Sequence, residues 1–208
     1  MSKGIILRCD YFQGSGFGHL RRTNILANSL KQRDFKPFLL IDNFPSEKNI
    51  SIDVQFEKIS LKKFDELKDA DLVISYAKSK NAKAVVVDSY RISEKWVNSL
   101  KKNKLKVILI DDFDKDLGGD LSINYTPSNK IGGRNSIISI NSLRGPQFFL
   151  TDSKSFESKK VFPERIIAHA GGNGDYTKAK YIYSKLAEIS DANSIKVDWI
   201  CPNSLSLN

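Results

Sequence analysis

The sequence predicts an α/β protein built on a parallel β-sheet. Short, continuous apolar runs at residues 84–88 (AVVVD) and 106–110 (KVILI) are typical of strands buried on both faces. Segments whose apolar residues recur at helical spacing lie between such runs, most clearly at residues 19–33. Because parallel strands need crossover connections, which helices usually supply, this alternation favours a parallel sheet covered by helices on both faces.

The first 150 residues should form one Rossmann-type domain. Strands are expected over residues 4–9, 36–42, 54–59, 84–88, 106–110 and 121–124, the last of which should end the sheet. Helices are expected over residues 19–33, 61–68, 71–80 and 94–102. Ser93 is the expected N-cap of the last helix, because its hydroxyl can accept a hydrogen bond from a free amide of the first turn.

The pattern restarts after residues 151–162, a polar segment that we interpret as a linker. A strand is expected over residues 165–170, a helix over 177–189 and a strand over 195–200. A single β-α-β unit cannot bury both faces of its strands. We therefore expect residues 163–208 to be the start of a second α/β domain that this chain truncates.

Composition excludes several classes of protein. The net charge of +9 suits an anionic partner, but the lysines are scattered and do not alternate with aromatic residues, so a nucleic-acid partner is disfavoured. No apolar run reaches the roughly 18 residues of a membrane span, and no signal peptide is recognisable, so a cytoplasmic location is expected. Cys9 and Cys201 are the only cysteines, which disfavours a disulfide framework or a zinc site. The oligomeric state stays open.

The loop after the first strand is the first candidate binding site. It contains Gly14, Gly16 and Gly18 and leads into the first helix. Ligands of open α/β sheets bind beyond the carboxyl ends of the strands, and a helix N-terminus favours negative charge. The loop is neither a dinucleotide motif, whose third glycine would fall at His19, nor a Walker A motif, which needs Gly-Lys-Ser/Thr. A sugar- or phosphate-binding loop is expected; a turn that binds no ligand is the alternative.

His19 is the candidate general base. It is one of two histidines, and it opens the first helix, whose positive dipole end disfavours an imidazolium. A neutral imidazole is what a general base needs. The alternative is a histidine that caps the helix or packs on the loop. We interpret the other histidine, His169, as structural, and Asp111 and Asp112 as residues that cap the turn after their strand.

An ordered set of short motifs runs along nearly the whole chain. The opening motif reads R-x-D, then G-x-G-H-x-x-R and L-A, and it comprises Arg8, Asp10, Gly16, Gly18, His19, Arg22, Leu26 and Ala27. The later motifs comprise Asp88-Ser89-Tyr90 with Trp96, Ile110-Asp111-Asp112, Ile123-Asn124, Leu143-Arg144-Gly145-Pro146, and Ala170-Gly171-Gly172 with Asp175. In this order the motifs resemble those of PseG-type enzymes, the UDP-sugar hydrolases of pseudaminic acid biosynthesis.

The resemblance implies a GT-B-like fold, in which the active site lies between two Rossmann-like domains, and relatives among MurG-type glycosyltransferases. It also implies hydrolysis of a UDP-linked deoxy-amino sugar at the anomeric C–O bond, without a metal or organic cofactor. His19 would take a proton from the attacking water, and Asp10 would orient His19 or a sugar hydroxyl. The expected substrate-binding residues are Gly14, Gly16, Gly18, Arg22, Asp88, Tyr90, Gly171 and Gly172. Within this set, Arg22 should brace the loop rather than contact phosphate.

The sequence also departs from the family pattern. Residues 147–152 (QFFLTD) lack the family's Arg and Glu, and Gly174 is an extra residue in the Gly-Gly turn. The chain is also expected to contain only the start of the second domain. In the family, that domain holds most of the uridine and diphosphate contacts. Two alternatives therefore stay open, because a fold does not determine a function: a glycosyltransferase, and a truncated module that binds a nucleotide sugar without catalysis.

Overall fold

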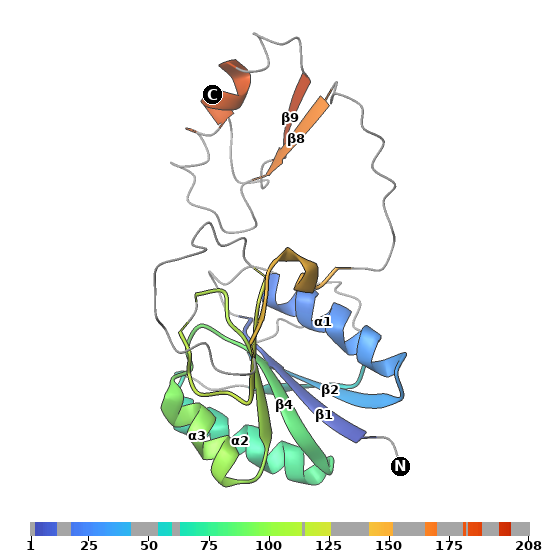
Figure 1. Cartoon of the computed structure of the whole chain (residues 1–208), viewed down its shortest axis with the longest axis vertical. Helices are drawn as coiled ribbons and strands as arrows, with labels where there is room; N and C mark the ends of the chain where they lie inside the picture. The colour runs from blue at the N-terminus through green and yellow to red at the C-terminus, as the bar shows by residue number, and fades with distance from the viewer. Residues whose placement is uncertain are drawn as a thin grey trace. The chain divides into compact units, whose positions relative to one another are not determined.

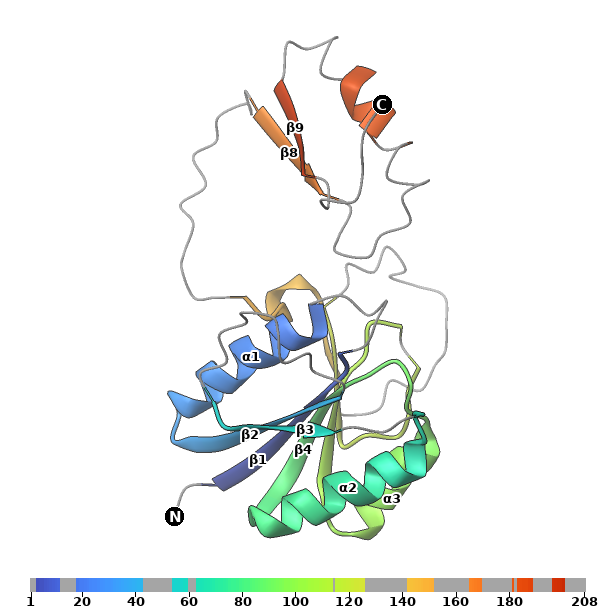
Figure 2. The same ribbon diagram turned by 180° about the vertical axis from the view of Figure 1, so that it is seen from behind.

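In the computed structural model, the chain divides into two units, Met1–Asp152 and Ser153–Asn208, and each is described by itself. The structure describes residues 3–11, 18–42, 54–59, 63–113, 115–125, 142–151, 165–169, 181, 183–188 and 196–200. Figures 1 and 2 show these parts of the chain from opposite sides. Gly14, Gly16, Gly171 and Gly172 of the predicted site lie outside the described residues.

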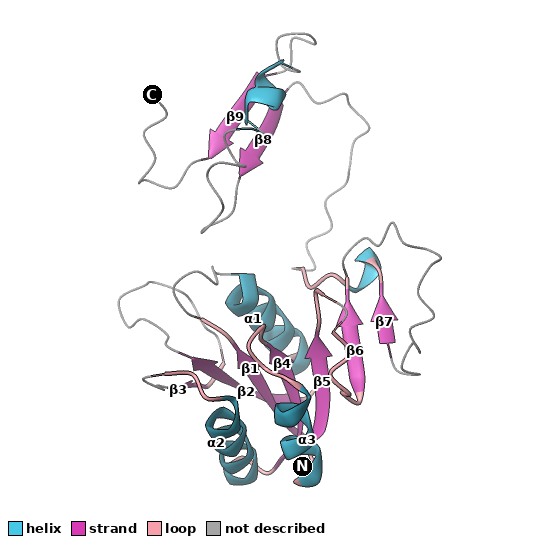
Figure 3. Cartoon of the chain, turned by 90° about the vertical axis from the view of Figure 1, so that its left-hand side faces the viewer, coloured by secondary structure: helices cyan, strands magenta, loops and turns pink. Residues whose placement is uncertain are grey.

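A seven-stranded parallel sheet forms the centre of the first unit, with the strand order β3-β2-β1-β4-β5-β6-β7. Its strands are β1 (Lys3–Cys9), β2 (Phe35–Asp42), β3 (Phe56–Ile59), β4 (Ala82–Asp88), β5 (Lys106–Ile110), β6 (Leu121–Asn124) and β7 (Ser142–Arg144). Figure 3 shows β5, β6 and β7 as neighbouring arrows that point the same way. The strand order reverses between β1 and β4, which is the point where open α/β sheets bind their ligands.

Helices cover both faces of this sheet, as the sequence predicts. Helix α1 (Gly18–Lys31) packs against β1 and β2, whereas α2 (Glu66–Ser79) and α3 (Glu94–Lys102) pack against β1, β4 and β5. Figure 2 shows α1 on one side of the strands and α2 and α3 on the other.

The apolar runs of the strands are explained by these two helical layers. Successive residues of a strand point to opposite faces. On β4, Val86 therefore joins the buried cluster under α1, while Val85 and Val87 join the cluster under α2 and α3. On β1, Leu7 and Ile6 divide in the same way. The α/β fold with a parallel sheet is thus the one that the sequence predicts.

The structure corrects the prediction of separate helices over residues 61–68 and 71–80. The single helix α2 begins after Asp65, whose Oδ1 accepts hydrogen bonds from the amides of Leu67 and Lys68 at 3.0 and 3.2 Å. The apparent break in the pattern falls at Asp69. This residue is fully buried on the core side of the helix, where an apolar side chain is expected, and it pairs with Arg8.

The prediction that the strand over residues 121–124 ends the sheet is also wrong. β7 pairs with β6 in parallel and forms an edge, with Ser122 opposite Ser142. None of its three residues is buried, so its sequence carries no apolar run. Gly145 follows with a φ of 108°, a conformation that favours glycine, and the chain turns into a short 3-10 helix at Pro146–Phe148.

The second unit contains two parallel strands, β8 (Arg165–His169) and β9 (Lys196–Ile200), which confirm the predicted strands. Residues 181 and 183–188 are helical and lie within the helix predicted over residues 177–189. Among the described residues of both units, no helix is long and apolar enough to cross a membrane.

Candidate functional site

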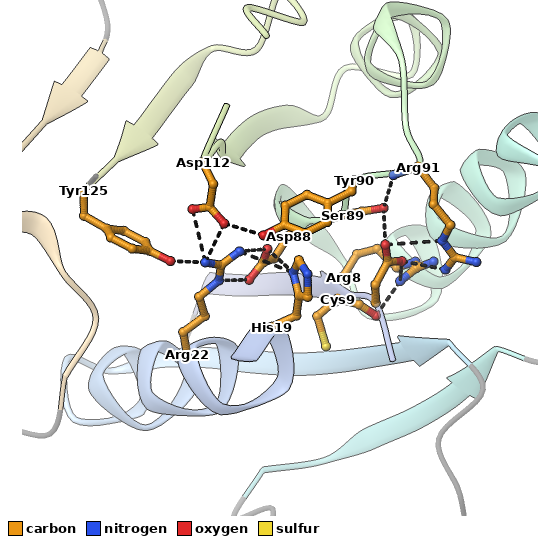
Figure 4. Close-up of polar contacts among 11 residues, drawn as sticks. Arg8, Cys9, His19, Arg22, Asp88, Ser89, Tyr90, Arg91, Asp112 and Tyr125 are labelled. Carbon is orange, nitrogen blue, oxygen red and sulfur yellow. Dashed lines mark hydrogen bonds and ion pairs between the residues drawn. The ribbon is translucent and has the colours of Figure 1, made fainter. Parts of the chain in front are cut away.

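The candidate site lies at the carboxyl ends of β1, β4 and β5. Asp10 directly follows β1, Asp88 ends β4, and the backbone amide of Asp10 donates to the carbonyl of Asp88 at 3.1 Å. His19 and Arg22 lie in the first turns of α1, which begins after the loop that follows β1. Figure 4 shows the side chains that meet here.

His19 is held by Asp88. Its Nδ1 lies 2.6 Å from Oδ1 of Asp88, and both side chains are almost fully buried. A carboxylate can only accept, so we assign the ring proton to Nδ1, which makes Nε2 the acceptor nitrogen of the neutral ring. Arg22 Nη2 is 3.3 Å from the same Nδ1, but it donates to Asp88 Oδ1 at 2.5 Å, so Asp88 is the better partner for both groups.

Asp88 keeps its negative charge in this buried position. Burial alone raises the pKa of the carboxyl, but hydrogen bonds and charge interactions with Arg22 and His19 outweigh it and hold the pKa below its usual value. The site therefore contains a fixed anion next to the imidazole.

Arg22 connects three segments of the chain. Its guanidinium donates to Asp88, to Asp112 with Nη1 at 2.9 Å from Oδ2, and to the hydroxyl of Tyr125, over whose ring it also lies at 5.5 Å. Burial lowers the pKa of Arg22, but the two carboxylates reverse this and raise it above its usual value. The guanidinium is thus a fixed cation that already binds protein groups.

Tyr90 packs against His19 and is bound by Asp112. Its ring meets the His19 ring edge to face, with centroids 4.4 Å apart and planes at 72°. Its hydroxyl donates to Oδ2 of Asp112 at 2.6 Å, and burial together with this acceptor raises the pKa of Tyr90 to about 12. Tyr90 as a whole is 39% exposed, so it is one of the large side chains of the site that reach the surface.

The position of Asp10 differs from the expectation that it orients His19, because Asp88 makes that contact. Asp10 is fully buried and accepts hydrogen bonds from Arg91 Nη2 at 2.6 Å, from Ser89 Oγ at 2.7 Å and from Arg8 Nη1 at 3.3 Å. The reason is strand alternation: Asp10 points to the same face as Arg8, towards α2, whereas His19 belongs to α1 on the opposite face. Its carboxylate is occupied by protein groups rather than open to a sugar hydroxyl.

A second group of buried charges lies on the α2 side, and sequence reasoning missed it. Arg8 donates to Asp69 from Nε at 3.0 Å and from Nη2 at 2.7 Å, and Trp96 Nε1 donates to the same carboxylate at 2.8 Å. Arg91 joins Asp10 to Asp42, the last residue of β2. The signal for this group was Arg8, an arginine next to the carboxyl end of the apolar first strand.

Asp111 and Asp112 differ in role, although both were predicted to cap a turn. Asp111 does so, because its carboxylate accepts from the amides of Phe113 and Lys115 at 3.0 and 2.6 Å. Asp112 instead binds the side chains of Arg22 and Tyr90, which local sequence could not reveal. Within the described ranges, no three residues of the metal-binding types are grouped to hold a metal ion.

The glycine of the first loop that the structure describes, Gly18, is the first residue of α1. A Cβ atom added there would meet nothing within 4 Å, so the described structure sets no steric need for glycine at this position.

The fold and the place of the site define a Rossmann-type domain of the GT-B-like class, whose polar site lies where the strand order reverses. No protein-family model and no curated protein matches the chain. Solved structures do. MurG of Acinetobacter baumannii is similar with a TM-score of 0.62 and 14% identity, over 97% of this chain and 61% of MurG. A glycosyltransferase of Rickettsia africae is similar with a TM-score of 0.56 and 12% identity, over 98% of this chain and 69% of that protein.

The chain therefore spans less than two thirds of the length of MurG. At identities this low the similarity establishes the fold alone, and that fold is the one seen in MurG-like glycosyltransferases.

Proposed function

We propose that the chain carries the base-containing part of the active site of a nucleotide-sugar hydrolase. In this reaction His19 Nε2 takes a proton from water, and the water oxygen bonds to the anomeric carbon. The bond from that carbon to the diphosphate oxygen breaks, so that UDP leaves with the electron pair and the free sugar forms. The observation that carries the proposal is the buried hydrogen bond of 2.6 Å between His19 and Asp88 at the sheet's switch point.

The charge of Asp88 supports this assignment. A buried carboxylate on Nδ1 fixes the tautomer whose Nε2 can accept a proton, and it stabilises the positive charge that the ring gains. The assignment requires Asp88 to stay ionised next to the imidazole. Its lowered pKa meets that requirement.

The other predicted residues take supporting roles in the proposal. Tyr90, an exposed residue, contacts the sugar, and Gly18 with the other glycines of the first loop lets the substrate approach. Gly171 and Gly172 contact the diphosphate. The substrate is a UDP-linked deoxy-amino sugar, as the resemblance to PseG-type hydrolases suggests. Arg22 braces the site, because its donors face Asp88 and Asp112.

A glycosyltransferase is the second candidate, favoured by the similarity in fold to MurG and to the Rickettsia glycosyltransferase. In that reaction His19 would take the proton from an acceptor hydroxyl instead of water. The residues of the candidate site are the same, since either reaction needs a base next to the anomeric carbon.

Incubation of the complete natural protein with UDP-linked deoxy-amino sugars, without any acceptor, tests the proposal. A hydrolase releases UDP and free sugar in equal amounts, whereas a transferase releases little until an acceptor hydroxyl is added. The variant His19→Ala should lose about 10²- to 10⁴-fold in kcat. The variant Asp71→Asn, on the exposed side of α2, is the control and should keep the wild-type rate.

A loss of less than about tenfold in His19→Ala would show that His19 is not the base. Calorimetry with UDP and with the UDP-sugar then separates the remaining cases. Binding without turnover would identify a binding module, and binding of neither ligand would reject both enzymatic functions.

A further inference from the structure

Five side chains at the candidate site form a closed ring of contacts. His19 bonds to Asp88, and Asp88 bonds to Arg22. Arg22 in turn bonds to Asp112, and Asp112 accepts the hydroxyl of Tyr90. The ring of Tyr90 then packs edge to face on His19, which closes the circle. Figure 4 shows Asp112 above Arg22, with Tyr90 and His19 beside them.

We propose that Asp112 is a positioning residue for His19, and this inference rests on the proposed function of His19 as the base. Asp112 contacts two members of this circle of side chains, Tyr90 and Arg22. Through the Tyr90 hydroxyl it fixes the aromatic ring that lies against the imidazole. Through Arg22 it fixes the guanidinium that holds the Asp88 carboxylate. The imidazole is thereby held by the ring of Tyr90 on one side and by Asp88 at Nδ1.

The hydrogen bonds of Asp112 support this role over that of a turn cap. Its Oδ2 accepts from Arg22 Nη1 at 2.9 Å and from the Tyr90 hydroxyl at 2.6 Å, and its Oδ1 lies 3.2 Å from the same Nη1. Both oxygens thus face side chains that are 90 and 22 positions away in the sequence. The neighbouring Asp111 caps the turn, so the local backbone does not need a second acceptor.

The side-chain exposures fit a support that is built into the site. The side chain of Asp112 is 16% exposed and that of Arg22 is 13% exposed, so both hydrogen bonds are partly shielded from water. Charge-assisted hydrogen bonds are stronger and more directional than neutral ones, and they are stronger still where water is excluded. Removal of Asp112 leaves Arg22 bound to Asp88 but takes away the carboxylate that accepts from the Tyr90 hydroxyl, so we expect the imidazole to gain freedom while the fold persists.

Nitrogen-15 NMR of the imidazole tests this inference without any need for activity. The chain has two histidines, so labelled histidine gives two ring systems, and the variant His169→Gln assigns the signal of His19. In the wild type we expect one sharp signal with the proton on Nδ1. In Asp112→Ala we expect a signal that is broadened or averaged between tautomers, and in Asp112→Asn an intermediate signal, since the amide oxygen can still accept from Tyr90.

Kinetics on the complete natural protein supply the second readout. Asp112→Ala should lower kcat by about 10- to 100-fold with little change in KM, because a small misplacement of the base slows the step without weakening substrate binding. Asp112→Asn should recover part of that loss. Asp71→Asn on α2 is again the control and should match the wild type in both readouts.

Three results would overturn the inference. The first is an unchanged His19 signal in Asp112→Ala. The second is an Asn variant that is no better than Ala while both lose thermal stability and kcat in parallel, because that marks a merely structural residue. The third result concerns the case in which Asp112→Ala does not fold. Tyr90→Phe, which removes only the hydroxyl, is then measured instead, and an unchanged His19 signal in that variant would overturn the inference. If the wild-type protein were inactive but all variants gave the expected NMR signals, the proposed function would be rejected, whereas the positioning of His19 by Asp112 would be retained.

Discussion

Asp10 and Asp88 are neighbours at the ends of β1 and β4, yet their carboxylates serve opposite faces of the sheet. The backbone amide of Asp10 donates to the carbonyl of Asp88 at 3.1 Å. The Asp88 side chain bonds to His19 and Arg22 of α1, while the Asp10 side chain bonds to Arg8 and Arg91 on the α2 side. One carboxylate therefore serves the candidate base, and the other lies among buried charges.

The first prediction concerns the exchange of Asp88 for an amide. Asp88→Asn keeps the size of the side chain but removes the charge and can donate to Nδ1, which would favour the wrong tautomer of His19. We expect kcat for UDP release to fall by about 10²- to 10⁴-fold, comparable to the loss in His19→Ala. The double variant should lose little more than either single one, because the two residues act as a unit. If the loss in kcat of the double variant equalled the product of the two single losses, His19 and Asp88 would not act as a unit.

The second prediction concerns the dependence of stability on acid. The pKa of Asp88 in the fold lies below the value of about 3.9 of an unfolded chain, so folding favours the carboxylate. The stability from its bonds is complete above that unfolded value and is lost as the pH falls through the folded pKa. Urea unfolding should thus show that the difference between wild type and Asp88→Asn shrinks below about pH 4. A difference that stays constant down to pH 2 would contradict this.

Much of the first unit could be predicted from the sequence, because each strand that is buried on both faces leaves a continuous apolar run. The same alternation also separates the two aspartates. Val86 lies under α1, so Asp88, two residues on, must point there too. Arg8 shares its face with Asp10 for the same reason. The predicted role of Asp10 next to His19 ignored this parity.

The side-chain contacts of the candidate site and of the buried charges could not be predicted, because they join residues that are distant in sequence. The 61 positions between Arg8 and Asp69, and the 90 between Arg22 and Asp112, leave no local pattern. Asp69 even misleads, since a charge on the buried side of a helix interrupts the apolar periodicity that identifies the helix. The edge strand β7 lies beyond prediction for the opposite reason, as three half-exposed residues carry no periodicity.

The third prediction concerns the buried pair of Arg8 and Asp69. Both side chains are fully buried, so the loss of one partner leaves a buried charge without its counterpart. We expect Arg8→Met and Asp69→Asn each to lower the free energy of unfolding by about 3–5 kcal/mol. The double variant should cost clearly less than the sum, with a coupling of about 1 kcal/mol or more. Urea unfolding at pH 7 measures all three.

A matched control for this cycle is Arg33→Met. Arg33 is exposed near the end of α1 and bonds to Ser29 at 2.8 Å, so its replacement should change stability by less than about 0.5 kcal/mol. Strict additivity of the Arg8 and Asp69 variants would show that the two residues stabilise the fold independently, in conflict with the bonds of 2.7 and 3.0 Å between them.

The fourth prediction concerns the thiol of Cys9. Cys9 is fully buried under α1, and burial raises its pKa to about 12, an effect to which the nearby carboxylates of Asp88 and Asp10 add. Only the thiolate attacks a disulfide reagent, so at pH 8 only about one thiol in 10⁴ would be reactive even if the reagent could reach it.

In the variant Cys201→Ser we expect the native protein to react at least about 100-fold more slowly with Ellman's reagent than the same chain in guanidinium, where one thiol per chain reacts. The variant Cys9→Ser, measured in parallel, gives the rate of Cys201. Rapid reaction of native Cys201→Ser would mean that the α1 side of the sheet opens readily, and it would contradict a tightly packed layer beneath the candidate base.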